Sequence, residues 1–299
     1  MPVSGHRRKH ARALPRQCLG RALSVGLSDK EKIALAVSWL TSADGLLVTA
    51  GAGMGVDSGL PDFRSKRGFW RAYPAFEDTG MAFHQIASPA AMRALPTLGW
   101  GFYGHRLELY RRTTPHPGFY ILREWAARMP RGLFVYTSNV DGQFQKAGYP
   151  DERIVECHGS IHYLQCTDLC SRAIWSADEL QVFVDSHTCR LLSELPTCPR
   201  CGAMTRPNIL MFDDYEWIDE RTERQYAQFE RWRECVSKLV VIEIGAGKVV
   251  STVRRFSEKH GPRVIRINTN DYAIAPHVGI GIAGSALETL RAIKALETD

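Results

Sequence analysis

The stretch LLVTAGAGMGVDSGLPDFR, residues 46–64, decides the fold of this 299-residue chain. Its apolar start has the character of a buried strand, and Gly51, Gly53 and Gly55 follow directly. Glycines after a strand let backbone N–H groups approach a phosphate without a Cβ in the way, and a helix that begins there adds its positive dipole end. The stretch therefore predicts a nucleotide-binding turn, although Val56 stands where a strict G-x-G-x-x-G has its third glycine. A glycine-rich turn without a ligand stays open from this stretch alone.

The formal net charge of +6 belongs to the amino terminus. Residues 1–28 hold six basic side chains and no acid, and removing these six from the 38 basic residues leaves 32, which equals the number of acidic residues. The rest of the chain is therefore neutral, which argues against nucleic acid as the main partner. Residues 1–27 have the composition of a disordered basic tail, with an organelle transit peptide as the alternative. We expect a cytoplasmic protein, or a mitochondrial one if this tail is a transit peptide.

Strand-like and helical segments alternate at both ends of the chain, and no apolar run approaches the ~20 residues of a membrane-spanning helix. The alternation predicts an α/β fold with one doubly wound, Rossmann-like parallel sheet. An aromatic, proline-punctuated segment reads as a helical insertion. The expected strands lie at 46–49, 132–137, 153–157, 238–244 and 264–267. The expected helices begin near Ser28 or Asp29, near 118 and near 216. The sheet domain would comprise residues 28–68, 118–159 and 205–295, and the helical insertion residues 69–117.

Two pairs of cysteines indicate a structural metal site. Cys166 and Cys170 form the first pair, and Cys198 and Cys201 form a tighter knuckle. Two thiolates on a turn supply one edge of a tetrahedron and a second pair supplies the other, so the four cysteines predict one structural Zn²⁺ with no open position. Residues 160–204 would then form a small zinc-binding module. Free core thiols are the alternative, Cys189 or His187 is a substitute ligand, and Cys18, Cys157, Cys189 and Cys235 are expected to be free.

Polar residues follow two of the predicted strands. Asn139 and Asp141 come directly after one strand, and His158 follows the next. An open α/β sheet binds its ligand at the carboxyl ends of its strands, so these side chains are directed at one crevice. The ordinary pKa of histidine near 6.5 suits a general base for a hydroxyl group. Asn139 can hydrogen-bond a sugar hydroxyl and Asp141 can accept from an amide, although either can also simply cap a turn.

Five motifs in fixed order resemble the sirtuin family of NAD-dependent protein deacylases. They are GAGMGVDSGLPDFR, TSNVDGQFQKAG, ECHGSI, the paired cysteines and RPNILMF, and the resemblance spans roughly residues 29–290. It implies a Rossmann-like NAD-binding domain, a smaller lobe made of the zinc module and helices, and a cleft between them. NAD would be the co-substrate and an acyl-lysine protein or peptide the partner.

The resemblance also implies roles for single residues. His158 would be the general base, with Asn139 and Asp141 at the ribose and the nicotinamide amide. Phe212 would lie on the segment that pairs with the substrate peptide. The residues implied at the cofactor are Gly51, Ala52 and Gly53 at the phosphates, Asp62, Phe63 and Arg64 in the cofactor loop, Ser138, Asn139 and Asp141 at the nicotinamide ribose, Gly245 and Gly247 under the phosphates, and Asn268 at the adenosine ribose.

The implied reaction is attack of the acyl oxygen on the nicotinamide ribose, release of nicotinamide, and transfer of the acyl group to ADP-ribose. Some positions depart from the family pattern. Ser138 replaces the usual glutamine of T-Q-N, and Asp213 replaces a glycine after Phe212. These departures keep a mono-ADP-ribosyltransferase or NAD hydrolase open, and a non-catalytic NAD-sensing module as well.

Overall fold

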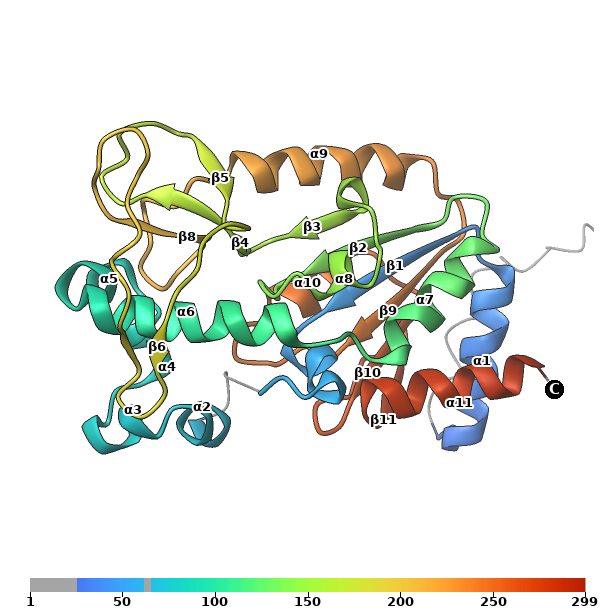
Figure 1. Cartoon of the computed structure of the whole chain (residues 1–299). Coiled ribbons are helices and arrows are strands. Elements are labelled where there is room, and N and C mark those ends of the chain that lie inside the picture. Colours follow the sequence, from blue (N-terminus) through green and yellow to red (C-terminus); the bar gives the residue numbers. More distant parts are fainter. Residues whose placement is uncertain (1–25, 62–65, 299) are drawn as a thin grey trace, which may run out of the picture.

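The computed structural model describes residues 26–61 and 66–298 and shows two lobes (Figure 1). Most of the predicted basic tail lies outside these residues, as do Asp62, Phe63 and Arg64. The larger lobe is built on one parallel sheet of six strands in the order β11-β10-β9-β1-β2-β3. Its strands are β1 (Gly45–Ala50), β2 (Leu133–Thr137), β3 (Ile154–Glu156), β9 (Leu239–Ile244), β10 (Val264–Asn268) and β11 (Gly279–Ala283). The α/β, Rossmann-like prediction is confirmed.

The central strands are buried on both faces, which explains why they read as continuous apolar runs. Every residue of β1 and of β9 is buried, and the two strands pair in parallel from Gly45 with Leu239 to Ala50 with Ile244. A parallel sheet covered on both sides selects such runs rather than alternation. The five strands predicted from the sequence are all present, whereas the edge strand β11 was not predicted.

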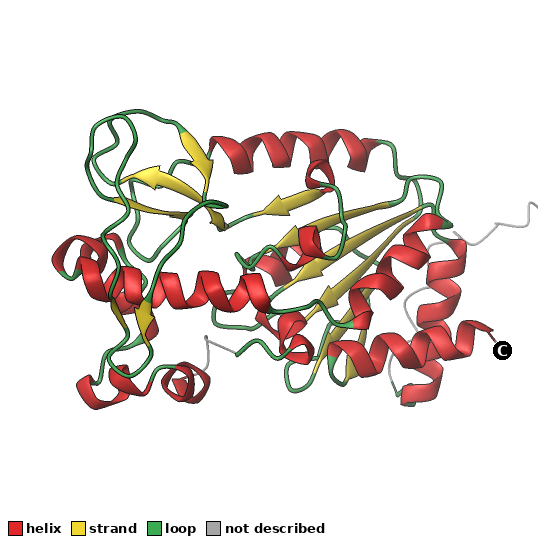
Figure 2. Ribbon diagram, viewed as in Figure 1, coloured by secondary structure: helices red, strands yellow, loops and turns green. Residues whose placement is uncertain are grey.

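Helices cover both faces of the sheet (Figure 2). One face packs against α1 (Asp29–Ser42), α7 (Pro117–Ala127) and α11 (Ala286–Thr298), and the other against α9 (Glu220–Glu234) and α10 (Thr252–Lys259). The predicted start of α1 is confirmed, because Ser28 forms a capping box with Glu31. Helix α9 begins at Glu220 and not at Glu216, because the Asp214 carboxylate accepts from the Glu216 N–H and fixes a loop there.

The smaller lobe combines short helices with a second sheet. The antiparallel sheet has the order β5-β4-β8, and a separate hairpin of β6 and β7 packs on α6. A Cβ on Gly101 would lie 2.0 Å from the Cys189 carbonyl oxygen, so only glycine allows α6 to approach the hairpin this closely. The elements are α2 (Lys66–Ala72), α3 (Pro74–Thr79), α4 (Phe83–Ile86), α5 (Pro89–Ala94), α6 (Pro96–Arg112), β4 (Gly159–Cys166), β5 (Ile174–Ser176), β6 (Val184–Asp185), β7 (Arg190–Leu191) and β8 (Thr205–Ile209).

Strand β8 belongs to the small lobe and not to the domain predicted for it. Residues 205–209 were assigned to the sheet domain, but β8 pairs with β4 in the small lobe. Short elements join the sheet to the site, namely the 3₁₀ helices η2 (Ala52–Ser58) and η3 (Asp151–Arg153) and the helix α8 (Gln143–Lys146). Among the described residues, no helix combines the length and the apolar character that a membrane crossing needs.

Candidate active site

A cavity of about 940 Å³ lies between the two lobes at the carboxyl ends of the parallel strands. The chain runs from β1 outward to β3 on one side and from β9 outward to β11 on the other, so the strand order reverses between β1 and β9. Doubly wound sheets bind ligands at such a reversal. Ten of the residues predicted from the sequence line this cavity: Ala52, Gly53, Ser138, Asn139, Asp141, His158, Phe212, Gly245, Gly247 and Asn268.

The glycine loops after β1 and β9 contact each other through their backbones. The Gly53 N–H donates to the Gly245 carbonyl at 3.1 Å. A Cβ on Gly53 would lie 2.6 Å from the Gly245 Cα, and one on Gly51 would lie 2.7 Å from the Gly245 oxygen. Gly51 therefore packs behind the cavity wall, while a Cβ on Gly247 would meet nothing within 4 Å. The predicted helix after β1 is a 3₁₀ helix of seven residues, η2.

The loop after β2 is tied to the glycine loop. The Asn139 side chain donates from Nδ2 to the Gly51 carbonyl at 2.9 Å, and its N–H donates to Thr137 Oγ1 at 3.0 Å. The Asp141 carboxylate accepts from the Gln143 N–H at 3.0 Å. The predicted turn-capping role is thus present for Asp141, whereas the Asn139 side chain bonds the distant Gly51 instead, and both residues line the cavity as well.

Burial changes the acidity of Asp141. Its side chain is buried, and desolvation together with the nearby Glu156 charge raises its pKa to about 6, against the lowering effect of the Gln143 N–H. A carboxyl group with this pKa is mostly ionised in neutral solution but keeps a protonated fraction of roughly one tenth. It can therefore exchange a proton or accept a hydrogen bond within the cavity.

His158 stands where the two lobes meet. It lies two residues after the end of β3 and lines the cavity, and its carbonyl accepts from the Leu210 N–H at 2.9 Å. The next residues along that segment, Met211 and Phe212, line the same cavity. The Phe212 ring packs edge to face on Phe83 at 5.8 Å between centroids. The predicted base and the predicted peptide segment are therefore neighbours.

Sequence reasoning missed the ion pair that shapes this segment. Arg206 and Asp214 form a salt bridge in which both side chains are almost fully buried. The Asp214 carboxylate also accepts from the Met211 N–H at 3.1 Å. An aspartate eight residues after an arginine that begins the RPNILMF motif carried no periodic signal, so only the fold brings the pair together.

The opposite end of the cavity is closed by two loops after β9 and β10. Asn268 donates from Nδ2 to the Ala246 carbonyl at 3.1 Å, and its Oδ1 accepts from the N–H groups of Asn270 and Asp271. Lys248 crosses from the other loop and pairs with Asp271 at 2.7 Å. This pair lines the cavity and was not predicted, because its members come from different loops.

Helix α6 supplies a third wall. Tyr103, Arg106 and Tyr110 recur with helical spacing, and all three line the cavity. The Arg106 guanidinium is buried, donates to the Tyr110 hydroxyl from Nε and Nη2, and lies 5.2 Å from the centroid of the Phe102 ring. Arg106 was not singled out from the sequence, although its spacing from Tyr103 places both on one helix face.

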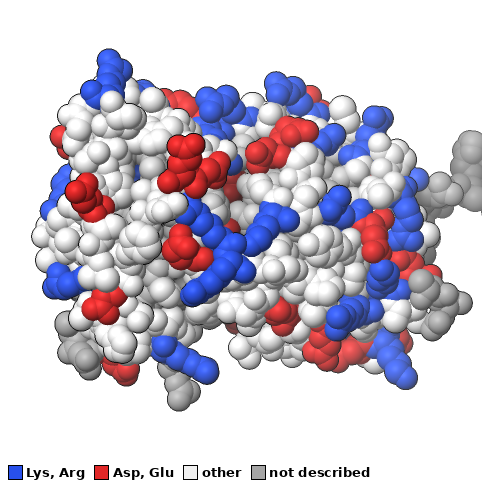
Figure 3. Space-filling view, in the orientation of Figure 1, with Lys and Arg blue, Asp and Glu red and all other residues white. Residues whose placement is uncertain are grey.

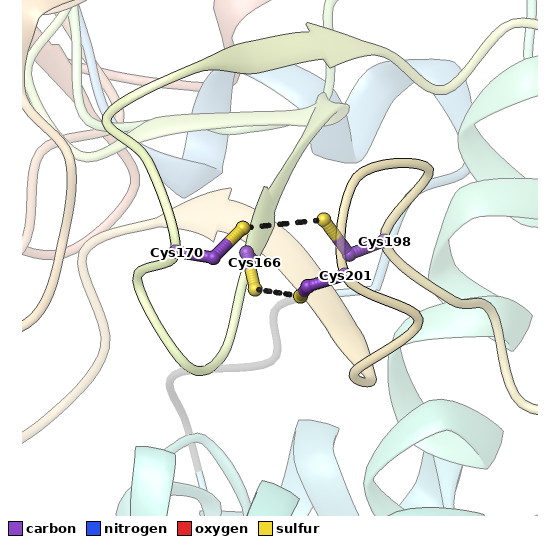
Figure 4. Close-up of side chains that lie close together, drawn as sticks. All are labelled: Cys166, Cys170, Cys198 and Cys201. Carbon is purple, nitrogen blue, oxygen red and sulfur yellow. Dashed lines mark hydrogen bonds between the residues drawn. The ribbon is translucent and has the colours of Figure 1, made fainter.

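The four predicted metal ligands lie together in the small lobe (Figure 4). All four sulfur atoms are within 4.8 Å of one another, and the closest approaches are 3.6 Å for Cys166 with Cys201 and 3.7 Å for Cys170 with Cys198. Those distances are too long for disulfides and match the separation of about 3.8 Å that follows from Zn–S bonds of about 2.3 Å in a tetrahedron.

The four thiols differ in acidity, and a hydrogen bond with Cys201 raises the pKa of the Cys170 thiol to about 12. Backbone N–H groups of Arg200 and Cys201 lower the pKa of the Cys198 thiol to about 7, which favours the thiolate that a metal needs. Neither Cys189 nor His187 belongs to the cluster. Cys157, Cys189 and Cys235 form no disulfide within the described part of the chain, as predicted, and Cys18 lies outside it.

Comparisons with known proteins agree with this geometry. A family model described as the Sir2 family matches residues 51–251. The NAD-dependent protein deacylase 2 of Pyrobaculum aerophilum is 31% identical over 259 residues, covering 84% of this chain and 90% of the relative. A probable bifunctional ADP-ribose hydrolase/ADP-ribosyltransferase of Fusarium oxysporum is 30% identical and covers 75% of this chain but 39% of the relative. A structure titled for the mechanism and regulation of Sir2 enzymes has a TM-score of 0.65, 25% identity, and coverage of 90% of this chain and 98% of its own.

Proposed function

This chain belongs to the Sir2 family, and on that premise we propose that it is an NAD-dependent protein lysine deacylase. It transfers the acyl group of an acyl-lysine to ADP-ribose and releases nicotinamide. NAD is the co-substrate, and a protein or peptide carrying the acyl-lysine is the partner.

One observation carries this proposal: a single cavity joins the glycine loops, Asn139, Asp141 and His158. Ala52 and Gly53 at the start of the 3₁₀ helix η2, with Gly245 and Gly247, line the side of the cavity where the phosphates would lie. Asn139 and Asp141 lie between that side and the peptide segment, where the nicotinamide ribose would sit. The reacting sugar therefore meets the acyl-lysine beside His158.

His158 is the general base in this proposal. It accepts the proton of a ribose hydroxyl as that hydroxyl attacks the acyl carbon. Apolar side chains from the small lobe, Ile209, Met211 and Phe212, line the cavity near it and limit the access of water to the cationic sugar. The four cysteines would hold a zinc ion that stabilises the small lobe and, with no open coordination position, takes no part in acyl transfer.

The wall formed by α6 favours an acyl chain with a negative end. Arg106 brings a positive charge into a cavity wall made of aromatic rings, where solvent screens it little. A carboxylate at the end of the acyl group would gain from this charge. We expect succinyl-lysine peptides to be turned over faster than acetyl-lysine peptides, and Arg106→Lys to keep more of this preference than Arg106→Met.

A second reaction has some support. Ser138 and Asp213 depart from the sirtuin pattern at the cavity wall, and one relative is described as a probable ADP-ribosyltransferase. Mono-ADP-ribosyl transfer, or NAD hydrolysis, on the same scaffold would leave labelled ADP-ribose on protein or in solution without an acyl acceptor.

The deciding experiment measures nicotinamide release from NAD with a library of acyl-lysine peptides and with the unmodified peptide. Release should depend on an acyl group, and the formation of deacylated peptide should fall at least about a hundredfold in His158→Ala, because this histidine acts after nicotinamide has left. Release that never depends on the peptide contradicts it. A folded wild-type protein that binds NAD but reacts no faster than His158→Ala would instead support an NAD sensor.

A further inference from the structure

A second cavity, of about 360 Å³, lies behind the loop that carries Asn139 and Asp141. Its walls come from the end of α6, from α8, from β4 and from α9, and it shares Tyr110 and Asp141 with the main cavity. The His162 ring lies against this loop, since its Nε2 is 3.1 Å from the Asp141 carbonyl oxygen. A ligand in the second cavity would therefore touch the back of the loop that shapes the active site.

Arg221 supplies an unsatisfied donor to this cavity. Its residue is only 9% exposed, and it lines the cavity from α9. One guanidinium nitrogen, Nη2, pairs with Glu156 at 2.5 Å, and the guanidinium carbon lies 4.2 Å from the centroid of the Tyr163 ring. The other nitrogen, Nη1, is buried and has no hydrogen-bond partner among the described residues. A buried donor without an acceptor is costly, so the site gains free energy when an acceptor enters.

Lys146 adds a second positive charge to the wall. Its Nζ donates to the carbonyl groups of Arg111, at 2.5 Å, and of Thr113, at 2.6 Å. Carbonyl groups satisfy two of the three ammonium protons but do not neutralise the charge. Figure 3 shows basic side chains gathered over this region, where α6 ends beside α8.

Three carboxylates, those of Asp141, Asp151 and Asp178, also line the cavity and limit what it can accept. Asp151 and Asp178 are exposed residues, so water screens their charge more than it screens that of the buried Arg221. A large polyanion would meet these carboxylates at the surface. A small anion that reaches Arg221 would avoid most of the repulsion from Asp151 and Asp178, although Glu156 already pairs with the other guanidinium nitrogen and the buried Asp141 lines the same cavity.

We propose that this cavity is a binding site for a small anion, a carboxylate or phosphate group that accepts from Arg221 Nη1 and Lys146 Nζ. Charge-assisted hydrogen bonds of this kind are the stronger ones in proteins. The inference rests on the second cavity and not on the deacylase proposal, so either can fail without the other.

Calorimetric titration with inorganic phosphate tests the site. The protein is saturated with ADP-ribose, which occupies the phosphate side of the main cavity, and ionic strength is kept constant with sodium chloride. The expected result is binding of one phosphate per chain. Absence of any binding by the folded protein up to about 10 mM phosphate, which corresponds to a negligible affinity, overturns the proposal.

Two variants assign the donors. Arg221→Lys keeps the charge opposite Glu156 but removes the second nitrogen of the fork, and Lys146→Gln removes the exposed charge without touching the buried pair. Each should weaken phosphate binding by about tenfold or more, while the matched control Lys30→Gln on α1 binds as wild type does. Equal binding by all three contradicts the assignment. If Arg221→Lys fails to fold, as judged by circular dichroism, Lys146→Gln decides alone.

Discussion

The carboxyl end of the parallel sheet and the small lobe are held in place by different contacts. At the carboxyl end of the sheet, glycine backbones contact each other, and the Gly53 N–H donates directly to Gly245. The small lobe is held by side chains, namely the four-cysteine cluster and the buried pair of Arg206 with Asp214. The carboxyl end of the sheet should therefore be sensitive to added volume, and the small lobe to changes of chemistry at constant volume.

The largest expected effect comes from the cysteine cluster. Cys198→Ser preserves the volume but removes a thiolate ligand, and structural zinc sites contribute on the order of 10 kcal/mol to folding. We expect the variant to lose its zinc and the small lobe to lose amide protection from hydrogen exchange. Amides of β1 and β9 should stay protected, because their strands are buried in the other lobe.

Zinc content and hydrogen exchange by mass spectrometry measure both effects in one sample. The free thiol of Cys235 is exposed, so Cys235→Ser is a matched control that should change neither. Equal loss of protection in both lobes would contradict the separation drawn here.

The next test adds volume to a glycine loop at the carboxyl end of the sheet. Gly53→Ala places a Cβ 2.6 Å from the Gly245 Cα, and backbone cannot yield as a side-chain tip can. We expect a loss of about 1–3 kcal/mol in the free energy of unfolding, together with weaker NAD binding. Gly247→Ala meets nothing within 4 Å and should unfold as wild type does. Denaturant titration that gives the two variants equal stability would refute the contact.

The protonation of Asp141 also affects stability at the carboxyl end of the sheet. Its folded-state pKa is raised to about 6 from 3.8, so the folded chain holds the proton more tightly than the unfolded chain. Stability is then full at acidic pH with respect to this group and falls as the pH rises through the window from about 4 to about 6. Asp141→Asn removes this penalty and should be up to about 3 kcal/mol more stable near pH 8, with deacylation lost.

Unfolding curves at pH 4 and pH 8 measure this gain for wild type and variant. The gain should be absent at the lower pH, where the wild-type carboxyl is protonated. A variant that is less stable at both values would show that the carboxylate stabilises the loop through its bond to Gln143.

The smallest effect is expected at the pair of Lys248 with Asp271. The Lys248 side chain is 62% exposed, and exposed ion pairs contribute less than about 1 kcal/mol. Lys248→Gln should change the KM for NAD by about fivefold at most and reduce its salt dependence. Lys30→Gln carries the same charge change far from the cavity and should leave the KM unchanged.

The sequence predicted the elements that a local pattern encodes. The five central strands are apolar runs, Ser28 with Glu31 forms a capping box, and the paired cysteines have metal-ligand spacing. The edge strand β11 escaped because its segment, Gly279–Ala283, contains two glycines and little apolar length. Arg106, Lys248 and the second cavity escaped for another reason: their meaning depends on which distant elements the fold places opposite them.

One measurement tests the central claim most directly. Wild type and His158→Ala are incubated with NAD and an acyl-lysine peptide, and mass spectrometry quantifies nicotinamide, deacylated peptide and the ADP-ribose products. We expect equal amounts of nicotinamide, deacylated peptide and acyl-ADP-ribose from wild type, and a loss of the transfer products in the variant. Nicotinamide released with ADP-ribose alone, in the same amount with and without the acyl group, would contradict it.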